Sequence, residues 1–436
     1  MAAAEREVVA FAADLIRIDT SNRGGGDCRE RPAAEYVAAQ LADAGLDPVL
    51  LESAPGRANV VARLAGQDPS AGALLAHGHL DVVPAEPADW DRHPFSGEIA
   101  AGVLHGRGAV DMKNADAALI AAVRQLARTG VRPRRDVVLA FTADEEDTAA
   151  YGAGWLVRNR PDLFDGCTEA IGESGAFTFH AGNGVRLYPV ASAERGTAWL
   201  KLTAHGRAGH GSKANPDNAV AKIAGAVARI SVHRWPVRLT PTVRAAIGAI
   251  ARAVGVEPGP LSDDSSVAET LARIGPAAAL VGNTIRNSAN PTMLAAGYKV
   301  NVIPAEAAAC VDGRVLPGYA DEFAAVLDEL TGPDVSWEYL HREIPLEAPL
   351  DAPVMGAMAA ALLAEDPGGT VVPHCMSGGT DAKQFSRLGI AGYGFTPLLL
   401  PAEFDYYEMF HGVNERVPVA ALEFAVRVLT RFLATA

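Results

Sequence analysis

Strand-like and helix-like segments alternate from residue 1 to about residue 190, and this order limits the fold more than any other feature of the chain. "ANVVARLA" and "GALLAHGHLDVV" have the apolar patterns of strands, and "RDVVLAFTADEE" contains an apolar run typical of a buried strand. Between them, "KNADAALIAAVRQLARTG" has helical apolar spacing and stops at Gly130. The alternation predicts an α/β fold with a mainly parallel sheet flanked by helices.

The pattern changes near residue 191. "TAWLKLTAHGRAGHGS" alternates like an antiparallel strand, an Ala-rich helical stretch runs from about 240 to 280, and "VSWEYL" is again strand-like. The α/β pattern returns near residue 346, with the strand "GIAGYGF" and a final helix "PVAALEFAVRVLTRFLA". We therefore predict a first domain in two parts, 1–191 and 346–436, with an inserted α+β domain at 192–345.

Charge excludes two classes of partner. The chain has 38 Lys and Arg against 52 Asp and Glu, a formal net charge of −14 over 436 residues. Nucleic acids and anionic membranes are bound by basic faces, so we expect neither partner. No uninterrupted apolar segment reaches the ~18 residues that a transmembrane helix needs.

The four cysteines lie far apart and form no Cys-x-x-Cys pair. This spacing indicates neither a thiolate zinc site nor a disulfide framework. The N-terminal segment carries charged residues before any apolar run and resembles an amphipathic helix more than a signal peptide. A reduced, cytoplasmic setting is the simplest expectation.

Histidine and carboxylates follow several predicted strands. His79 and Asp81 lie two apart at the end of one strand, and Glu145 and Glu146 end another. Ligands of α/β sheets bind beyond the carboxyl ends of the strands. A lone His-x-Asp is also consistent with a hydrogen-bonded pair at a sheet edge. A ligating histidine, however, commonly passes its other N–H to a carboxylate.

Three further residues have suitable chemistry: Asp111 before a helix, Glu173 after a short apolar stretch, and His411 before the last helix. Each alone is equally consistent with a helix cap, a turn or a loop residue. Together with the residues at the strand ends they form a mixed nitrogen and oxygen donor set, which suits Zn²⁺, Co²⁺ or Mn²⁺. The adjacent glutamates repel each other unless a cation holds them.

The motifs that carry these residues resemble a known family, the zinc-dependent metallopeptidase superfamily of aminoacylase, glutamate carboxypeptidase, succinyl-diaminopimelate desuccinylase and acetylornithine deacetylase. They occur in the family's order between residues 78 and 417. The matching runs are "GHLDVVP", "PFSGEI", "GRGAVDMK", "TADEE", "GHGSKANPDNA", "NVIP", "DGR", "GGTDAKQF" and "HGVNERV". The resemblance implies a di-zinc exopeptidase-like α/β fold with an inserted lid or dimerisation domain.

The resemblance also implies two divalent metal ions, zinc in the first place with cobalt or manganese as alternatives. Asp111 would bridge the two ions. Glu173 would complete the ligands of one ion, and His411 would complete those of the other. His77 stands two residues before His79 and is the alternative ligand. The implied ligands are His79, Asp111, Glu146, Glu173 and His411.

Three residues are given catalytic or positioning roles by the resemblance. Glu145 would be the general base that activates a water, and Asp81 would orient the imidazole of His79. His210 would stabilise the oxyanion, and in dimeric relatives this histidine comes from the neighbouring subunit. A surface loop histidine is the alternative interpretation of His210.

A substrate carboxylate needs a guanidinium or amide partner. Asn301 and Arg314 match the family's positions in "NVIP" and "DGR". Ser377, Gly378 and Gly379 match a glycine-rich segment of the family that lines the pocket. The two glycines are equally consistent with ordinary turn residues.

The chain departs from the family pattern in two places. Asn114 follows "DMK" where relatives have glycine, and the inserted domain is lengthened by the helical stretch near 240–280. The second departure brings the chain closer to the carboxypeptidase S-like and aminoacylase-like branch.

These features predict a two-metal hydrolase that cuts an amide bond next to a free carboxylate. Its substrate would be a dipeptide, a peptide C-terminus or an N-acyl amino acid, and a homodimer is compatible with the motifs. The alternatives are a non-catalytic homologue that binds metal or ligand, a deacylase of a specialised N-acyl metabolite, and a two-metal phosphoesterase.

Overall fold

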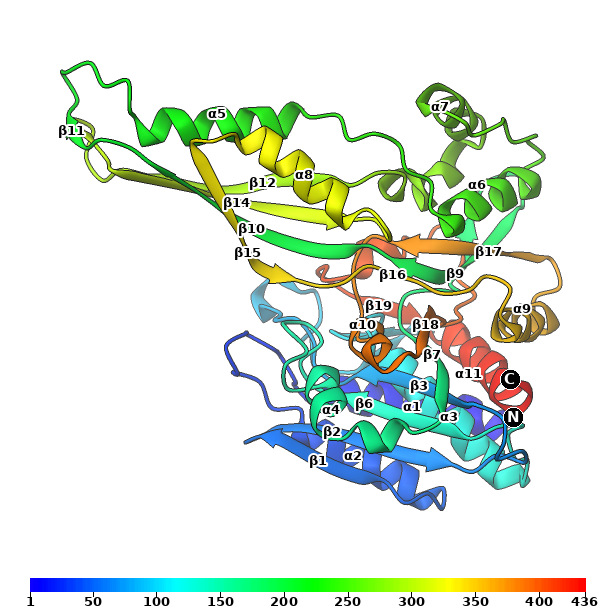
Figure 1. The fold of residues 1–436 in the computed structure, drawn as a ribbon. Coiled ribbons are helices and arrows are strands. Elements are labelled where there is room, and N and C mark those ends of the chain that lie inside the picture. Colours follow the sequence, from blue (N-terminus) through cyan, green and yellow to red (C-terminus); the bar gives the residue numbers. More distant parts are fainter.

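The computed structural model describes residues 1–436, and its largest layer is a ten-stranded sheet (Figure 1). The order is β1-β2-β6-β3-β7-β18-β9-β16, and β8 and β17 also pair with β9. The central strands β6, β3, β7 and β18 are parallel, whereas β1, β2, β8 and β16 pair antiparallel. The strands are β1 Val49–Ala54, β2 Arg57–Leu64, β3 Ala73–His79, β6 Val137–Thr142, β7 Cys167–Gly172, β8 Phe179–His180, β9 Arg186–Glu194, β16 Leu346–Glu347, β17 Gly369–Met376 and β18 Ala391–Gly394. The predicted fold class, a mainly parallel central sheet with flanking helices, is confirmed.

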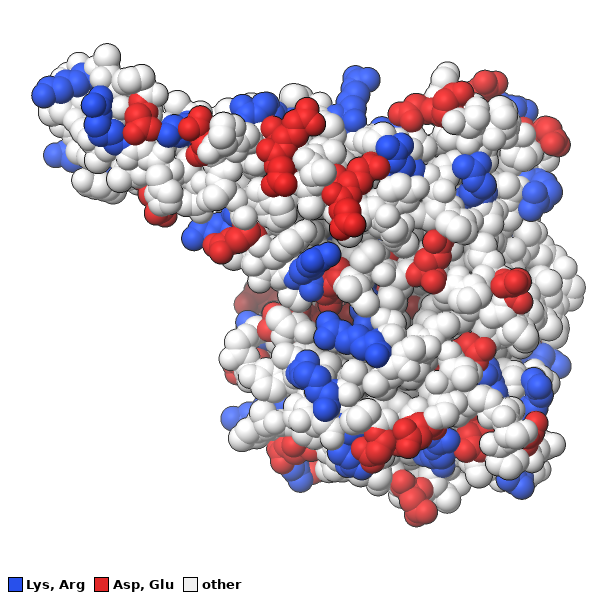
Figure 2. All heavy atoms as spheres, viewed as in Figure 1, with Lys and Arg blue, Asp and Glu red and all other residues white.

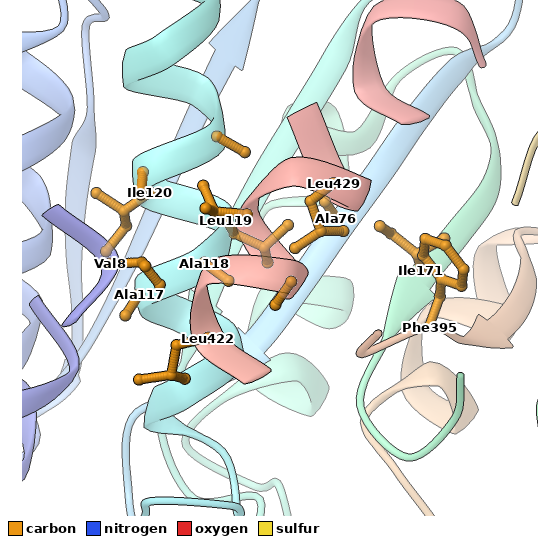
Figure 3. Packing of buried hydrophobic residues seen from close by; sticks show 14 of the residues in the cluster. Val8, Ala76, Ala117, Ala118, Leu119, Ile120, Ile171, Phe395, Leu422 and Leu429 are labelled. Atoms are coloured by element: carbon orange, nitrogen blue, oxygen red, sulfur yellow. The ribbon is translucent and has the colours of Figure 1, made fainter. Parts of the chain in front are cut away.

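Helices cover both faces of this sheet. On one face α1 (Ala2–Arg17), α3 (Lys113–Thr129) and α11 (Val419–Thr435) pack against one another in a core of 59 residues (Figure 3). The α3 surface carries small residues such as Ala117 and Ala118, which let its neighbours approach closely. Helix α3 ends, as predicted, at Gly130, whose φ of 67° suits a residue without Cβ.

Other helices complete the two layers. α2 (Arg31–Asp43) lies over β2, and α9 (Pro353–Glu365) packs on α11 and β17. On the second face, α4 (Ala153–Asn159) and α10 (Ala382–Phe385) bury Leu156 and Phe385 against strand residues such as Leu75 and Val138. The strands alternate their side chains between the two cores, as strands buried on both faces must.

A second, four-stranded antiparallel sheet has the order β12-β14-β10-β15. We call this sheet and its helices α5 and α8 the lid. The lid elements are β10 Gly196–His205, α5 Ala219–Val232, β12 Ser288–Ala296, β14 Glu306–Val315, α8 Ala320–Thr331 and β15 Val335–Arg342. Its own core includes Leu200, Ile223 and Phe323.

Two loops project from the lid, residues 206–218 and 297–305, and we call them the arm (Figure 1). They are joined by the short strands β11 (Gly209–His210) and β13 (Val302–Ile303).

The helical stretch predicted near 240–280 is present, but it packs on the large sheet and not on the lid sheet. α6 (Pro241–Ala253) begins at Thr240, which caps it, and lies against β9 and β17. Val243 and Ile247 are buried with Leu187 and Val372. The chain therefore leaves the lid after α5, returns to the large sheet, and enters the lid again at β12. The limits 1–191, 192–345 and 346–436 remain a prediction.

The remaining elements are short. A three-stranded sheet has the order β19-β5-β4, and none of the helices is both long and apolar enough to span a bilayer. These elements are β4 Glu98–Ala100, β5 Val103–His105, α7 Asp264–Arg273, β19 Arg416–Pro418, and the 3-10 helices η1 Pro87–Asp89, η2 Pro161–Phe164, η3 Gly275–Leu280, η4 Gly282–Thr284, η5 Ser386–Leu388 and η6 Tyr407–Met409.

Candidate active site

The ends of three neighbouring parallel strands supply most of the site. His79 is the last residue of β3, Glu173 directly follows β7, and Glu145 and Glu146 follow β6. Because β6, β3 and β7 are parallel neighbours, their carboxyl ends meet at one edge of the sheet. Asp111 reaches this edge from the loop before α3.

Asp111 lies between the two histidines. Its Oδ1 is 3.1 Å from Nε2 of His79, and its Oδ2 is 3.3 Å from Nε2 of His411. Nε2 of His79 also lies 3.7 Å from Oε2 of Glu173, and Nε2 of His411 lies 3.1 Å from Oε2 of Glu146. The structure thus brings all five predicted ligands together in two groups that share the Asp111 carboxylate.

The charges of this cluster call for cations. Burial raises the pKa of Glu145 well above its usual value, and the nearby Glu173 adds to the rise. Burial also raises the pKa of Glu173 to about 7. Oε1 of Glu146 is buried without a hydrogen-bond partner. An orphaned carboxylate oxygen beside two imidazoles fits a divalent metal such as Zn²⁺, Co²⁺ or Mn²⁺.

Glu145 lies beside the ligands. Its Oε2 is 3.9 Å from Nε2 of His79, and its side chain is 15% exposed. One ligand atom each from His79, Glu145 and Glu173 falls within 4.8 Å of the others. The Glu145 carboxylate accepts no hydrogen bond from the chain, so it can still accept a proton.

Asp81 contacts His79 in a way that the sequence did not predict. The ring Nδ1 of His79 contacts the backbone carbonyl of Asp81 at 2.9 Å, while the carboxylate Oδ1 is 3.7 Å away. The two carboxylate oxygens instead accept the backbone N–H groups of Glu145 and Glu146, each at 3.1 Å. Asp81 therefore orients the imidazole through its main chain and the two glutamates through its side chain.

His77, the alternative ligand, lies away from the cluster. Its ring packs 5.1 Å from Phe385 and belongs to neither ligand group. Burial lowers its pKa to about 3, so this imidazole is neutral in the core.

A buried network of hydrogen bonds and ion pairs lies behind the site, and the sequence did not predict it. The Arg57 guanidinium, 1% exposed, donates to Glu30 through Nε and Nη2 (2.8 and 2.7 Å) and to Oδ1 of Asp144 (2.7 Å). Asn22 donates to both Asp81 and Asp144. Asp144 precedes Glu145 and adopts φ of 67°, so its contacts fix the turn that carries the glutamates. Its place in "TADEE" was the available signal.

Glu415 fixes the other carboxylate. Its Oε1 accepts the backbone N–H groups of Val110 (2.6 Å) and Asp111 (3.0 Å), and its Oε2 accepts Gly108 N–H and Arg107 Nη1. The loop that presents Asp111 is therefore held by a residue four positions after His411. Glu415 stands in the matched motif "HGVNERV", which could have drawn attention to it.

A cavity of about 690 Å³ opens beside the cluster. Figure 2 shows acidic atoms set back in a hollow between the part that bears the arm and the rest of the molecule. The cavity is lined by Asp111, Glu145, Glu146, Glu173, Ser174, Phe177, Ala279, Leu280, Asn283, Thr284, Arg314, His374, Met376, Ser377, Gly378, Gly379, Tyr406, Tyr407, Phe410 and His411. Four of the five predicted substrate-binding residues are therefore at the cavity wall.

Arg314 already has a partner within the chain, whereas the glycine loop has free backbone donors. The guanidinium of Arg314 is paired with both oxygens of Asp312, at 2.7 and 3.0 Å. The backbone N–H groups of Ser377, Gly378 and Gly379 have no partner within the chain.

His210 and Asn301 lie on the arm and do not reach the cavity of their own chain. His210 pairs with Val302 across β11 and β13, and its Nδ1 contacts the Ser212 hydroxyl at 2.8 Å. The backbone carbonyl of Asn301 accepts a hydrogen bond from the N–H of Gly211. The structure keeps these two residues together, exposed, and apart from the metal ligands.

Comparison with known proteins gives consistent matches. The model of "Peptidase family M20/M25/M40" matches residues 75–435. The human N-fatty-acyl-amino acid synthase/hydrolase PM20D1 is 28% identical over 385 residues, 85% of this chain and 75% of that protein. Human aminoacylase-1 is 27% identical over 92% of this chain and 88% of its own length. The solved M20 family metallo-carboxypeptidase Sso-CP2 from Sulfolobus solfataricus shares the fold, with a TM-score of 0.71, 20% identity and 98% of each chain covered.

Proposed function

Since the chain belongs to peptidase family M20/M25/M40 and is a metal-dependent hydrolase, we propose that it uses two metal ions to cleave an amide bond next to a free carboxylate. The observation that carries this proposal is the Asp111 carboxylate between His79 and His411, with Glu145 beside it. A carboxylate shared between two donor groups can bridge a pair of ions held close together.

The proposed ligands divide into two shells. His79 and Glu173 would hold one ion, His411 and Glu146 the other, and Asp111 both. Zinc is the first choice, with cobalt or manganese as alternatives. Two bound cations would lower the pKa of a water molecule between them and polarise the scissile carbonyl.

Glu145 is the proposed general base. Its carboxylate accepts a proton from the attacking water and passes it to the departing nitrogen. Asp81 holds the backbone of Glu145 and its neighbour Glu146, so the base and one ligand keep a fixed spacing. Asp81 is thus a positioning residue in this scheme.

The substrate carboxylate is proposed to bind at the loop of Ser377, Gly378 and Gly379. The free N–H groups of this loop suit an anion, and the glycines allow close approach of the main chain. Arg314 faces the same cavity and adds positive charge, while Asp312 fixes the plane of its guanidinium.

We propose that His210 and Asn301 act in the site of a second copy in a homodimer. Both residues are absent from the cavity of their own chain and lie together on the exposed arm. The arm also exposes apolar side chains, with Tyr298 at 84% and Val300 at 104% of full exposure. Contact with a partner copy would bury them and bring the His210 imidazole to the developing oxyanion.

An N-acyl amino acid is the favoured substrate and a dipeptide the second. The names of the two human relatives, an N-fatty-acyl-amino acid synthase/hydrolase and an aminoacylase, support the first choice. The resemblance to a metallo-carboxypeptidase structure supports a substrate with a free carboxylate.

The test is a panel of acetyl-amino acids, longer acyl-amino acids and dipeptides, with p-nitrophenyl phosphate as the phosphoesterase control, assayed after loading with zinc, cobalt or manganese. Release of a free amino acid is expected. Glu145→Gln should retain both metal ions by elemental analysis and lose about 10²–10⁴-fold in kcat. Hydrolysis of the phosphate alone, or full activity of E145Q, would contradict the proposal.

A further inference from the structure

An aromatic cluster lines the cavity beside the metal ligands. Phe177 stacks on Tyr406 with ring centres 4.0 Å apart, and Tyr407 and Phe410 meet these rings edge-on at 5.4 and 4.9 Å. The four rings come from the segments that carry Glu173 and His411. Ser377–Gly379, in contrast, precedes Asp381, whose carboxylate accepts the hydroxyl of Thr142 near Glu145. The aromatic cluster and the glycine loop therefore belong to different segments around the ligands.

A second wall comes from the segment 275–284. η3 contributes Ala279 and Leu280, and η4 contributes Asn283 and Thr284. This segment is the end of the additional helical stretch, and α6 anchors that stretch on β17. β17 itself adds His374 and Met376 to the wall. The additional helical stretch thus ends in a segment that forms one wall of the active-site cavity.

These two walls carry no ionised group. Away from the ligands and Glu145, the charged side chain at the cavity is Arg314, which is already paired with Asp312. His374 is 8% exposed, and burial lowers its pKa to about 4, so its imidazole is neutral at pH 7. At about 690 Å³ the cavity falls within the range of ~300–1,000 Å³ that buries drug-sized ligands. It has room for more than an acetyl group on a small amino acid.

We propose that the space between the aromatic cluster and the segment 275–284 is the subsite for a bulky apolar acyl group. The enzyme then prefers N-acyl amino acids with long or aromatic acyl chains. This inference rests on the proposed amidohydrolase function and deepens it. The amino acid's carboxylate lies at the glycine loop, so the acyl part of the substrate takes the remaining, uncharged part of the cavity. Ala279 is exposed and lines the cavity on this segment, so a large side chain placed there would shorten the subsite.

The test compares Ala279→Trp with Ala272→Trp. Both alanines are exposed and close in sequence, but Ala272 lies on α7 outside the cavity lining, so it is the matched control. With A279W, kcat/KM for an N-dodecanoyl amino acid should fall about tenfold or more, while N-acetyl hydrolysis changes less than about twofold. A272W should behave as the wild type with both substrates. Thermal unfolding of each variant monitors the fold.

Two results would overturn the inference. One is an equal loss by A279W for both acyl lengths in a folded protein. The other is a loss that follows the size of the amino-acid side chain and not that of the acyl group, which would place the amino acid in this subsite. Failure of the wild type to cleave any acyl-amino acid or dipeptide would instead refute the proposed function. The two failures are thus distinguishable.

Discussion

The site edge of the large sheet and the arm of the lid differ in how they hold functional side chains. At the site edge, two buried carboxylates fix three of the residues by hydrogen bonds: Asp81 holds the backbone of Glu145 and Glu146, and Glu415 holds that of Asp111. On the arm, His210 is exposed and is held by a two-residue strand pair and by contacts to the neighbouring Ser212 and Lys213. Parallel strands bring side chains together within one chain, whereas the role proposed for the arm requires a second copy.

The largest effect is expected on stability, at the buried ion pairs behind the site edge. Arg57→Met removes the cation between Glu30 and Asp144 and leaves both carboxylates buried without a positively charged partner. The free energy of unfolding should fall by about 3–5 kcal/mol. Arg207→Met on the arm is the control, and this exposed side chain should change stability by less than ~0.5 kcal/mol. Urea unfolding of both variants measures the difference, and equal stabilities would contradict the contrast.

The next effect concerns His210. His210→Ala should lower kcat about 10²–10³-fold without loss of stability, because the variant removes one oxyanion donor and no buried contact. Mixing unfolded H210A and E145Q chains and refolding them together tests whether the histidine acts in the partner. A heterodimer has one intact site if it does, so roughly one quarter of wild-type activity should return. No recovery in mixed dimers would place His210 in its own chain's site.

The third prediction concerns the pH dependence of stability that the buried His374 in the cavity wall causes. The folded-state pKa of His374 is about 4 against an ordinary 6.5, because burial disfavours its charged form. Between these values the unfolded chain binds a proton that the folded chain does not, so stability falls as the pH falls. From pH 6.5 to about pH 5 the loss should be about 1.6 kcal/mol. Denaturant titrations of His374→Gln should show a correspondingly weaker pH dependence, and parallel curves for variant and wild type would refute this.

The smallest effect is on assembly. Val300→Ser on the arm should raise the dissociation constant of the dimer by roughly tenfold, about 1.4 kcal/mol, while the monomer's stability hardly changes. Val131→Ser, at an exposed position after α3, is the control. Analytical ultracentrifugation over a range of concentrations measures both. If neither variant changed self-association, the arm would not be the dimer contact.

The sequence predicted the fold class and the convergence of the ligands for one physical reason. Runs of buried strand that end at His79 or lead shortly to Glu145 or Glu173 place those side chains at one sheet edge wherever the strands are parallel. Asp111 and His411 lie outside that rule, and the motif resemblance supplied them. Their role as ligands stays a prediction, although the structure brings all five together.

Other parts of the site could not be derived in this way. Arg57 reads as an ordinary surface arginine at a strand start, because nothing local shows that Glu30 and Asp144 will enclose it. The carboxylate of Asp81 was expected to bind the imidazole of His79, but it accepts the backbone N–H groups of Glu145 and Glu146 after β6. The helical pattern of α6 shows that one face is buried without showing which sheet covers it. Tertiary packing decides such questions, and local patterns do not contain it.

The return of α6 to β17 has a practical consequence for protein engineering. The lid cannot be excised at residues 195 and 343 or grafted onto another scaffold as a module. Such a cut would remove Val243, Ile247 and Ile250 from their contacts with Leu187 and Val372. The remaining sheet would then expose an apolar surface to solvent. A transplantable unit would have to omit 233–287 and splice α5 directly to β12.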